Sequence, residues 1–427
     1  MRKIISVVFI ILLPLFSMAQ AKTDIFLKDL LLKNKDSILQ MILHHPEEYR
    51  FQIIYTQINR DRNNIPTFKN YYFNVDPLLY FNPASTVKMP LAFLSLEKLN
   101  RMHIKGVNKF TPMLIDSSYA GQTSQHQDTT SKDGYPSIAQ FIKEAFLISE
   151  NNAYNRMYEF IGQQTINEEL HQKGYPDVRI IRQFLPMNED ENRHTNAIRF
   201  ITKKGKLIYR QPPAYNTGSF DFSHVVFLGK AHYDSHDSLI ESPMDFTRQN
   251  NISLEDLQQI EQSVLFPYSV PEYKCFGLTP KDYRFLYQYL SQYPSETNYP
   301  KYDSSEYYNS YVKFFFKGEQ IPSYIRVFNK VGWAYGFLTD ISYLADFKHK
   351  IEYMLSCTVY VNSDGVLNDN KYDYDTVGYP FLRQVGNTIY QYELSRYRKY
   401  KPNLKRFNIH YEHRIQDGRP LVKDVDN

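Results

Sequence analysis

Apolar residues along the chain fall into three successive patterns, and the first of them combines a helix with two strands. Helical spacing over residues 24–45 predicts one amphipathic helix. Strand-like runs follow at residues 51–58 and 68–75, and the polar turn between them predicts a β-hairpin. The chain therefore opens in the order helix, strand, strand.

The middle of the chain is mainly helical by its spacing. Residues 112–135 are polar and rich in turn formers, and residues 198–201 and 207–210 flank a turn with Gly205, which predicts a second hairpin. Helices are predicted at residues 87–100, 138–148, 153–161, 166–172, 253–265 and 280–293, and residues 294–311 are expected to form a loop. Pro90 is compatible with the first of these helices because it falls close to the helix start.

Strand patterns return near the end. Runs at residues 324–330, 337–345 and 351–361 predict a meander, and residues 381–399 predict a closing helix. The tail from Pro402 is polar and basic and is expected on the surface.

This order predicts an α+β fold, an α/β sandwich in which one antiparallel sheet is built from both ends of the chain. The α/β part covers about residues 22–80 and 322–400. A mainly helical part at about 81–321, with an insertion near 190–250, lies between them, and residues 401–427 form a polar tail. A cleft between sheet and helices is expected.

Composition narrows the functional classes. The 427 residues carry 50 basic and 46 acidic side chains, a net charge of +4, which is too balanced for a nucleic-acid-binding surface. Residues 1–21 combine Arg2 and Lys3, an apolar run and small residues at the end, which predicts a cleaved signal peptide. We therefore expect a periplasmic or otherwise secreted protein with no membrane span after cleavage; a membrane anchor is the rival interpretation.

The cysteine and histidine residues add little to the functional prediction. Cys275 and Cys357 could form one disulfide in an oxidising compartment, and two buried free thiols are an equal alternative. His232 and His236 lie in a polar segment, which favours no metal site. We expect no metal and no cofactor.

The candidate chemistry begins at Ser85 and Lys88, which lie one helical turn apart. A serine hydroxyl needs a proton acceptor within hydrogen-bond reach to act as a nucleophile, and a buried lysine of lowered pKa can serve. The same Ser-x-x-Lys pattern also occurs at Ser95 and at Ser310. We expect those two copies on an exposed helix face and in a loop or short helix, so the pattern alone does not single out Ser85.

Two later motifs make the distinction. Ser149-Glu-Asn151 lies between two predicted helices, and Lys330-Val-Gly332-Trp333 ends a predicted strand. In this order the three motifs resemble those of the penicillin-recognising serine hydrolases, and most closely the class A β-lactamase-like branch. The resemblance covers about residues 24–399, with the middle poorly matched, and implies a β-lactamase/transpeptidase-like fold.

The resemblance also implies a role for each residue. Ser85 attacks the carbonyl and Lys88 accepts its proton, while Ser149 relays a proton to the leaving nitrogen. The residues expected to bind substrate are Asn151, Lys330, Gly332 and Trp333. The backbone N–H groups of Ser85 and Trp333 are expected to form the oxyanion hole. Trp333 is also interpreted as a packing residue at a strand edge, which is compatible with that role.

Two positions depart from the family pattern. Class A enzymes release the acyl group with a water activated by a glutamate, and Phe184 occupies the corresponding place here. Glu189, Asp190 or Glu191 could substitute, although a solvated acidic turn is favoured. Val331 replaces a hydroxyl residue and removes one hydrogen bond to a substrate carboxylate.

The sequence therefore predicts a serine hydrolase that forms an acyl-enzyme at Ser85 with a β-lactam or a peptidoglycan-type amide and hydrolyses it. The alternatives are a D-Ala-D-Ala carboxypeptidase or penicillin-binding protein, or an esterase, without efficient β-lactam turnover. A third alternative is an inactive binding protein on the same fold. The expected partner is a small molecule or peptidoglycan peptide.

Overall fold

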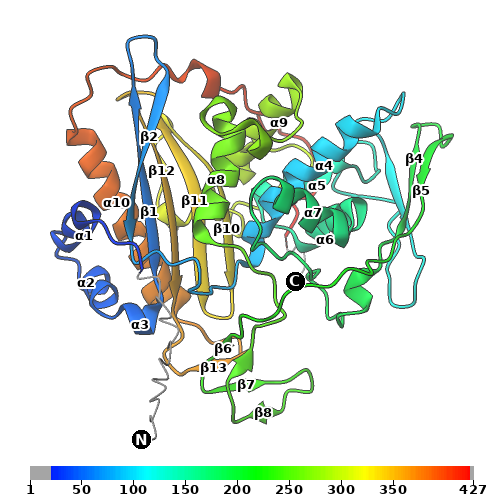
Figure 1. The fold of residues 1–427 in the computed structure, drawn as a ribbon. Coiled ribbons are helices and arrows are strands. Elements are labelled where there is room, and N and C mark those ends of the chain that lie inside the picture. Colours follow the sequence, from blue (N-terminus) through cyan, green and yellow to red (C-terminus); the bar gives the residue numbers. More distant parts are fainter. Residues whose placement is uncertain (1–20, 424–427) are drawn as a thin grey trace, which may run out of the picture.

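A five-stranded antiparallel sheet joins the two ends of the chain, as predicted (Figure 1). The computed structural model describes residues 21–423. The strand order is β10-β11-β12-β1-β2, and the central pairing of β12 with β1 aligns Cys357 with Ile53. The strands are β1 (Gln52–Arg60), β2 (Pro66–Phe73), β10 (Ile325–Ala334), β11 (Phe337–Asp346) and β12 (Ile351–Tyr360). The α+β fold class and both predicted strand groups are therefore confirmed.

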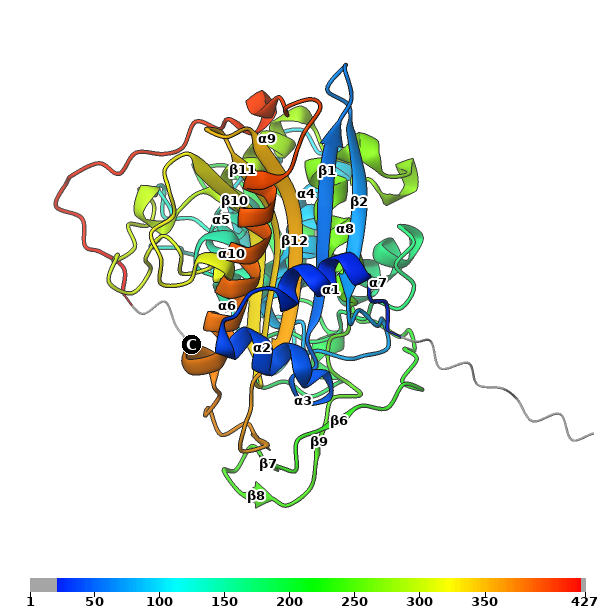
Figure 2. The same cartoon turned by 90° about the vertical axis from the view of Figure 1, so that its left-hand side faces the viewer.

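One face of the sheet is covered by helices from both chain ends (Figure 2). They are α1 (Ile25–Leu32), α2 (Ser37–His44), α3 (Pro46–Tyr49) and α10 (Tyr379–Ser395). The single helix predicted over residues 24–45 is wrong, because Asp36 accepts a hydrogen bond from the Leu39 backbone N–H at 2.9 Å and starts a new helix there. The apolar spacing continues across this break, which concealed it.

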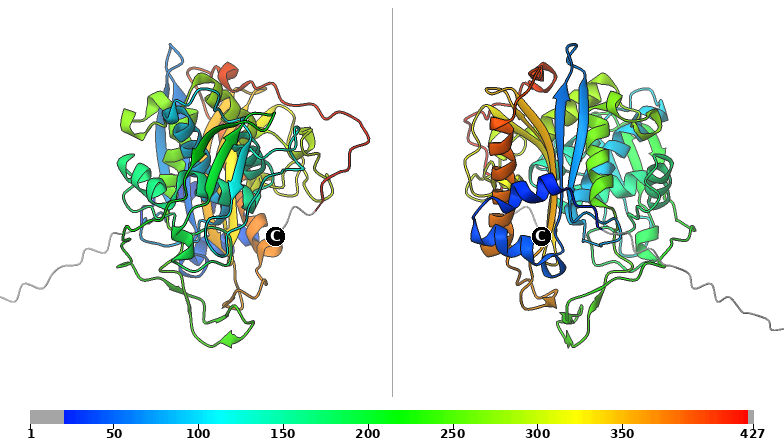
Figure 3. Two further views of the ribbon diagram at one scale, coloured as in Figure 1. Left: turned by 90° about the vertical axis from the view of Figure 1, so that its right-hand side faces the viewer. Right: turned by 60° about the vertical axis from the view of Figure 1, so that its left-hand side comes forward.

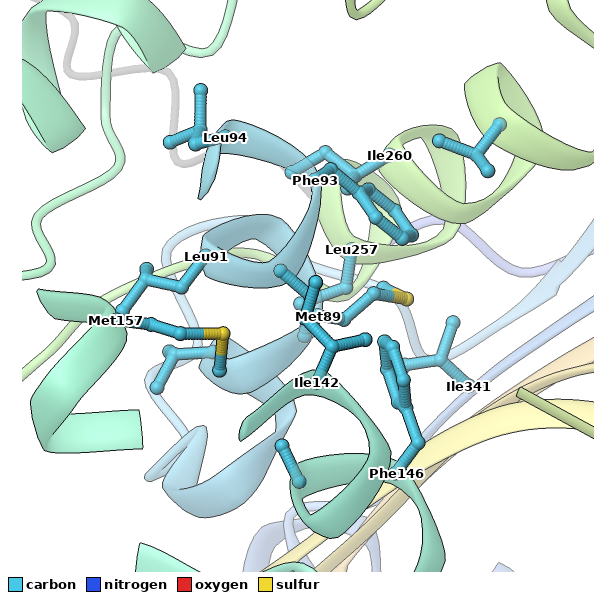
Figure 4. Close-up of a cluster of buried hydrophobic side chains, with 14 of the residues drawn as sticks. Met89, Leu91, Phe93, Leu94, Ile142, Phe146, Met157, Leu257, Ile260 and Ile341 are labelled. Atoms are coloured by element: carbon cyan, nitrogen blue, oxygen red, sulfur yellow. The ribbon is translucent and has the colours of Figure 1, made fainter. Parts of the chain in front are cut away.

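The opposite face packs against the inserted helices. These are α4 (Lys88–Met102), α5 (Ile138–Leu147), α6 (Asn151–Ile161), α7 (Gln163–Gln172), α8 (Leu254–Leu265) and α9 (Pro280–Ser291). All six helices predicted for this part are present. Figure 4 shows Met89 of α4 among side chains of α5, α8 and β11, including Ile142, Leu257 and Ile341, all fully buried. This core holds the N-terminal turn of α4 against the sheet.

Short strands form three smaller sheets away from the main one. They are β3 (Met113–Asp116), β4 (Ala197–Ile201) and β5 (Leu207–Gln211) in one sheet, β6 (Phe227–Leu228) and β9 (Met244–Asp245) in another, and β7 (Ala231–Tyr233), β8 (Leu239–Ile240) and β13 (Val366–Leu367) in a third. The β4–β5 hairpin is the predicted one (Figure 3). Strand β3 lies in the segment 112–135, which was predicted to form polar turns. The sequence pattern missed this strand because only four residues of the segment pair with β4.

Short 3₁₀ and π turns connect these elements. They are η1 (Ala84–Val87), η2 (Glu191–Arg193), η3 (Pro267–Ser269), η4 (Glu272–Lys274), η5 (Pro294–Glu296), η6 (Phe314–Phe316), η7 (Tyr374–Gly378) and η8 (Leu404–Phe407). The expectation that the whole tail lies on the surface is wrong at η8. Phe407 is 1% exposed and its ring packs at 4.7 Å from the ring of Tyr343, so the tail contributes to the core.

The predicted signal peptide lies, apart from Ala21, outside the described residues. Between residues 21 and 423 no helix has both the length and the apolar character needed to cross a bilayer.

Candidate active site

The segment that carries Ser85 is a strained entry into α4. Ala84 has a φ of +44°, which is uncommon for a residue with a side chain, and the Asn82 side chain accepts a hydrogen bond from its N–H at 2.9 Å. The 3₁₀ turn η1 then leads directly into α4, so that Ser85 and Lys88 lie one turn apart. Backbone strain of this kind persists where the surrounding structure enforces it, and it is common at functional sites.

The Lys88 ammonium group is buried at the centre of the site. Its Nζ donates to Ser85 Oγ at 2.8 Å and to Asn151 Oδ1 at 2.8 Å, and also to the backbone carbonyl of Ser149, whose Oγ lies 3.4 Å away. Burial lowers the pKa of Lys88 from 10.5 to about 7, and the negative charge of Glu150 partly opposes this shift. A large fraction of Lys88 is therefore neutral near neutral pH.

Ser149 occupies the corner between α5 and α6. Its φ of +65° places it in the left-handed region, where a helix usually ends with glycine. This turn brings the Ser149 hydroxyl between the two lysines, 2.8 Å from Lys330 Nζ. The next residue, Glu150, caps α6 by accepting from the backbone N–H of Asn152 at 2.9 Å and from that of Ala153. The corner therefore fixes the serine through the helix that follows it.

Lys330 enters from β10, the edge strand of the sheet. Its Nζ donates to Ser149 Oγ and, at 2.8 Å, to the backbone carbonyl of Val331. Burial, followed by the neighbouring Lys88 charge, lowers the pKa of Lys330 well below its ordinary value. Side chains alternate along a strand, so Lys330 and Gly332 face the helices while Val331 faces α10. Val331 is fully buried in the core on that side.

Gly332 allows β10 to approach the Ser85 segment. A Cβ atom at this position would lie 2.5 Å from the carbonyl oxygen of Pro83 and 3.0 Å from the backbone nitrogens of Ser85 and Thr86. The resemblance implies that Gly332 contacts the substrate. The crowded contact in the structure is with the backbone of η1, which brings the strand beside the Ser85 N–H.

The Trp333 side chain packs at this edge of the sheet. Its ring lies 5.7 Å from that of Phe314 and 6.2 Å from that of Tyr311. These contacts agree with the packing interpretation, and the predicted oxyanion role needs only its backbone N–H.

Phe184 lies against the lysine at the wall of the site. Its ring stacks on Tyr154 with 4.2 Å between centroids, and Lys88 Nζ lies 5.1 Å from the ring centre. The backbone N–H of Phe184 donates to Asn155 Oδ1 at 2.8 Å, which fixes the loop. A hydrophobic ring thus lies beside Lys88 at this wall of the site.

The three acidic residues after Phe184 are engaged elsewhere. Glu189 accepts from Arg248 at 2.6 Å, and Asp190 accepts from the Tyr215 hydroxyl at 2.9 Å. Glu191 accepts from a backbone N–H of its own loop at 2.7 Å. All three have exposed or half-buried side chains and none lines the cleft at Ser85. This arrangement agrees with a solvated acidic turn.

A cleft of about 460 Å³ opens at Ser85. Its walls combine polar and aromatic side chains from the 182–186 loop, the start of η1, the end of β10 and the segment before α8. The lining residues are Asn82, Ala84, Ser85, Asn151, Arg182, Gln183, Phe184, Leu185, Pro186, Gln249, Asn250, Trp333, Ala334 and Tyr335. Of these, Arg182, Gln183, Gln249 and Asn250 had no sequence signal, since they lie in irregular segments without a motif. A larger groove of about 1470 Å³, beside α9 and the tail, contains none of the predicted site residues.

In the two other Ser-x-x-Lys copies, the structure has no hydrogen bond between the serine hydroxyl and the lysine amine. Ser95 is fully buried, so the expectation of an exposed helix face is wrong, and Lys98 donates to the carbonyl of Phe160. Lys313 is also buried and donates to the Asn329 side chain. Only Ser85 has its lysine within hydrogen-bond distance among the three.

The remaining sequence candidates lie outside this site. Cys275 and Cys357 are free thiols. His232 Nδ1 contacts the carbonyl of Ser242 at 2.9 Å, and His236 is on an exposed turn. In the part of the chain that the structure describes, no group of three or more His, Cys, Asp and Glu side chains is arranged to hold a metal ion.

Comparisons with known proteins relate part of this chain to a family. Residues 39–206 match the model of the beta-lactamase enzyme family. No curated protein matches the chain. Among solved structures, a beta-lactamase from Burkholderia phymatum is 12% identical, with 84% of this chain and 99% of that chain covered and a TM-score of 0.47. A beta-lactamase from Sphaerobacter thermophilus is 12% identical, with 82% and 94% covered and a TM-score of 0.44.

A third solved structure carries another description. The protein called PBP-A is 14% identical, with 87% of this chain and 98% of that chain covered and a TM-score of 0.48.

The family match spans two of the three motifs. Residues 39–206 include Ser85 and Lys88 as well as Ser149 and Asn151. The third motif, at Lys330, lies outside the match and joins the others through its hydrogen bond to Ser149. Residues 39–206, with the two motifs that they contain, are therefore similar to the beta-lactamase enzyme family.

Proposed function

We propose that this protein is a serine hydrolase that forms an acyl-enzyme at Ser85 from the amide bond of a β-lactam or a peptidoglycan-type peptide. The observation that carries the proposal is the environment of Lys88. A buried amine with a pKa of about 7 contacts the Ser85 hydroxyl at 2.8 Å, so it has both the position and the affinity of a general base.

The hydrogen bonds of Lys88 account for the direction of proton transfer. A neutral amine has two N–H donors and one lone pair. The carbonyl of Ser149 and Oδ1 of Asn151 accept the two N–H groups, which leaves the lone pair for the Ser85 hydroxyl. Asn151 therefore orients the base as well as contacting substrate.

The reaction then proceeds by transfer of one proton. Ser85 Oγ bonds to the carbonyl carbon while its proton moves to Lys88, and the N–H groups of Ser85 and Trp333 stabilise the oxyanion. As the carbon–nitrogen bond breaks, the proton passes through Ser149 Oγ to the leaving nitrogen. Lys330 donates a hydrogen bond to Ser149 Oγ. The remaining lone pair of Ser149 Oγ can then accept the proton from Lys88, while the hydrogen of the Ser149 hydroxyl points at the leaving nitrogen.

Release of the acyl group distinguishes the possible activities. Phe184, at the place where the resemblance to class A enzymes implies the deacylating glutamate, lies against Lys88, and none of the three following acids lines the cleft. These features favour slow hydrolysis of β-lactam esters. We therefore prefer a peptidase or penicillin-binding activity, with β-lactams acting as inhibitors, over efficient β-lactam degradation.

Two other functions remain as alternatives. An esterase would use the same residues with an oxygen leaving group, which needs less help from Ser149. A binding protein without activity would not require Lys88 to be neutral, so the connected contacts of Ser85, Lys88, Ser149 and Lys330 speak against it. A peptidoglycan-type substrate also fits the export that residues 1–21 predict.

Covalent labelling tests the proposal. The protein is incubated with a fluorescent penicillin, and the labelled residue is identified by mass spectrometry. A chromogenic cephalosporin measures turnover in parallel. We expect stoichiometric label on Ser85 with little turnover.

Two serine variants serve as test and control. Ser85→Ala is expected to abolish labelling. Ser95→Ala changes another Ser-x-x-Lys serine whose Oγ has no hydrogen-bond partner, so it should label at the wild-type rate. Absence of label on the folded wild-type protein with several β-lactams and an ester substrate would contradict acyl-enzyme chemistry. Rapid cephalosporin turnover would instead favour a β-lactamase.

A further inference from the structure

The cleft at Ser85 is lined by only part of the predicted site. Ser85, Asn151 and Trp333 line it, whereas Ser149 and Lys330 do not. In the proposed function, on which this inference rests, Ser149 gives its proton to the leaving nitrogen. The leaving half of the substrate therefore lies beside Ser149, and the cleft receives the acyl half.

The walls of this acyl cleft carry one charged side chain. Arg182 is the only Lys, Arg, Asp or Glu among the lining residues. Its Nη2 donates to the carbonyl of Met187 at 2.8 Å, and no carboxylate of the described residues forms an ion pair with it. In contrast, the neighbouring Arg193 and Arg248 both pair with Glu189, at 3.3 and 2.6 Å. The cleft thus has an uncompensated positive charge.

The Arg182 backbone is held in place from two sides. Its N–H donates to Asn250 Oδ1 at 2.9 Å, and its carbonyl accepts from the Tyr154 hydroxyl at 2.7 Å. Tyr335 also lines the cleft, and its raised pKa is caused by burial and opposed by the Arg182 charge. Arg182 and Tyr335 thus line the same cleft, and the Arg182 charge acts on the Tyr335 hydroxyl.

Lys330, the lysine of the third motif, is poorly suited to bind a carboxylate of the acyl half. Lys330 Nζ already donates to Ser149 Oγ and to the carbonyl of Val331, and the buried Val331 side chain offers no hydroxyl. Beside Arg182, the Gln183 side chain is 3% exposed and its Oε1 has no hydrogen-bond partner among the described residues. A buried acceptor without a partner costs free energy that a ligand N–H can recover.

We propose that Arg182 is a specificity-determining residue that binds a carboxylate on the acyl half of the substrate. Gln183 accepts an N–H from the same half through Oε1. The substrate class is therefore an acyl donor whose side chain carries both an amide and a carboxylate, as an acidic peptide does. A charged guanidinium–carboxylate pair also excludes donors with apolar acyl groups from this end of the cleft.

Two matched penicillins test this proposal. They share the same nucleus and differ only in the acyl side chain, which ends in a carboxylate in one and in the corresponding carboxamide in the other. The measured quantity is the ratio of their second-order rate constants for acylation of Ser85. We expect the wild-type protein to favour the carboxylate by about 10-fold or more.

Three variants separate charge from structure. Arg182→Gln should bring the ratio to about one and leave the carboxamide rate close to wild type, whereas Arg182→Lys should keep part of the preference. Arg248→Gln, which removes a nearby arginine that does not line the cleft, should leave the ratio unchanged. Thermal unfolding of each variant checks the loop contact with Met187.

The outcomes are distinguishable. If Arg182→Gln slows both reagents equally and keeps the wild-type ratio, Arg182 only supports the loop, and the specificity proposal is overturned while acylation of Ser85 stands. The same holds if wild type shows no preference. If neither reagent acylates Ser85 in the wild-type protein, the proposed function fails, and the specificity proposal fails with it.

Discussion

Replacing Gly332 by alanine tests whether the close approach of β10 to the Ser85 segment builds the site. Gly332 is not among the residues with positive φ, so alanine brings no backbone strain of its own. Its Cβ would lie 2.5 Å from the carbonyl oxygen of Pro83 and 3.0 Å from the Ser85 nitrogen. Both neighbours are backbone atoms, which cannot rotate away.

The size of the effect follows from these distances. Ordinary carbon–oxygen contact requires about 3.3 Å, so the strand and η1 must separate by about 0.8 Å. A displacement of about 1 Å between reacting groups can reduce a rate by about 10²-fold, and overpacking costs about 1–3 kcal/mol of unfolding free energy. We therefore expect Gly332→Ala to acylate roughly 100-fold more slowly while remaining folded.

The assay is the rate of Ser85 labelling by a fluorescent penicillin, with thermal unfolding followed by circular dichroism. Gly418→Ala is the matched control, because a Cβ there meets no atom within 4 Å, and it should change neither quantity. A folded Gly332→Ala protein that labels at the wild-type rate would refute the reasoning, since the contact would then not position the oxyanion site.

Four further results follow from the same contacts. Acylation should rise with pH through about 7 and fall about tenfold per unit below it, because only neutral Lys88 accepts the proton. Glu150→Gln removes the charge that raises this pKa, so a stopped-flow pH profile should move to lower pH, and an unchanged midpoint would contradict the assignment. Phe184→Glu should hydrolyse a penicillin ester about 10²-fold faster than Phe184→Ala, measured by decay of the acyl-enzyme in mass spectra, if a base is all that deacylation lacks. Val331→Thr should lower the unfolding free energy by about 1–3 kcal/mol in urea without improving acylation, because the new hydroxyl is buried on the α10 side of the sheet; a gain in acylation would show that the hydroxyl reaches the cleft.

The elements were largely predictable because their apolar spacing is regular. The five main strands and the helices around Ser85 have long periodic patterns, and tertiary packing preserves them. The failures occurred where a local signal competed with that spacing. Asp36 caps a new helix within a continuous apolar repeat, and Phe407 becomes part of the core through aromatic contacts with residues distant in sequence.

The candidate site was likewise predictable from the sequence only in part. The motifs at Ser85, Ser149 and Lys330 were visible in the sequence, and their order indicated the family. The sequence could not show that Val331 faces away from the cleft, that Ser149 adopts a left-handed conformation, or that Arg182 has no acidic partner at the cleft. Each of these depends on which segments meet in space.

The sequence by itself therefore determined the elements, the family motifs and the candidate nucleophile, since spacing and residue type are local properties. The tertiary structure alone decided that burial lowers the pKa of all three lysines in the Ser-x-x-Lys pattern, and that only Lys88 contacts the hydroxyl of its serine. Burial and hydrogen bonding arise from α4, α5 and β10 meeting around that side chain, and removal from water is what makes a lysine a base.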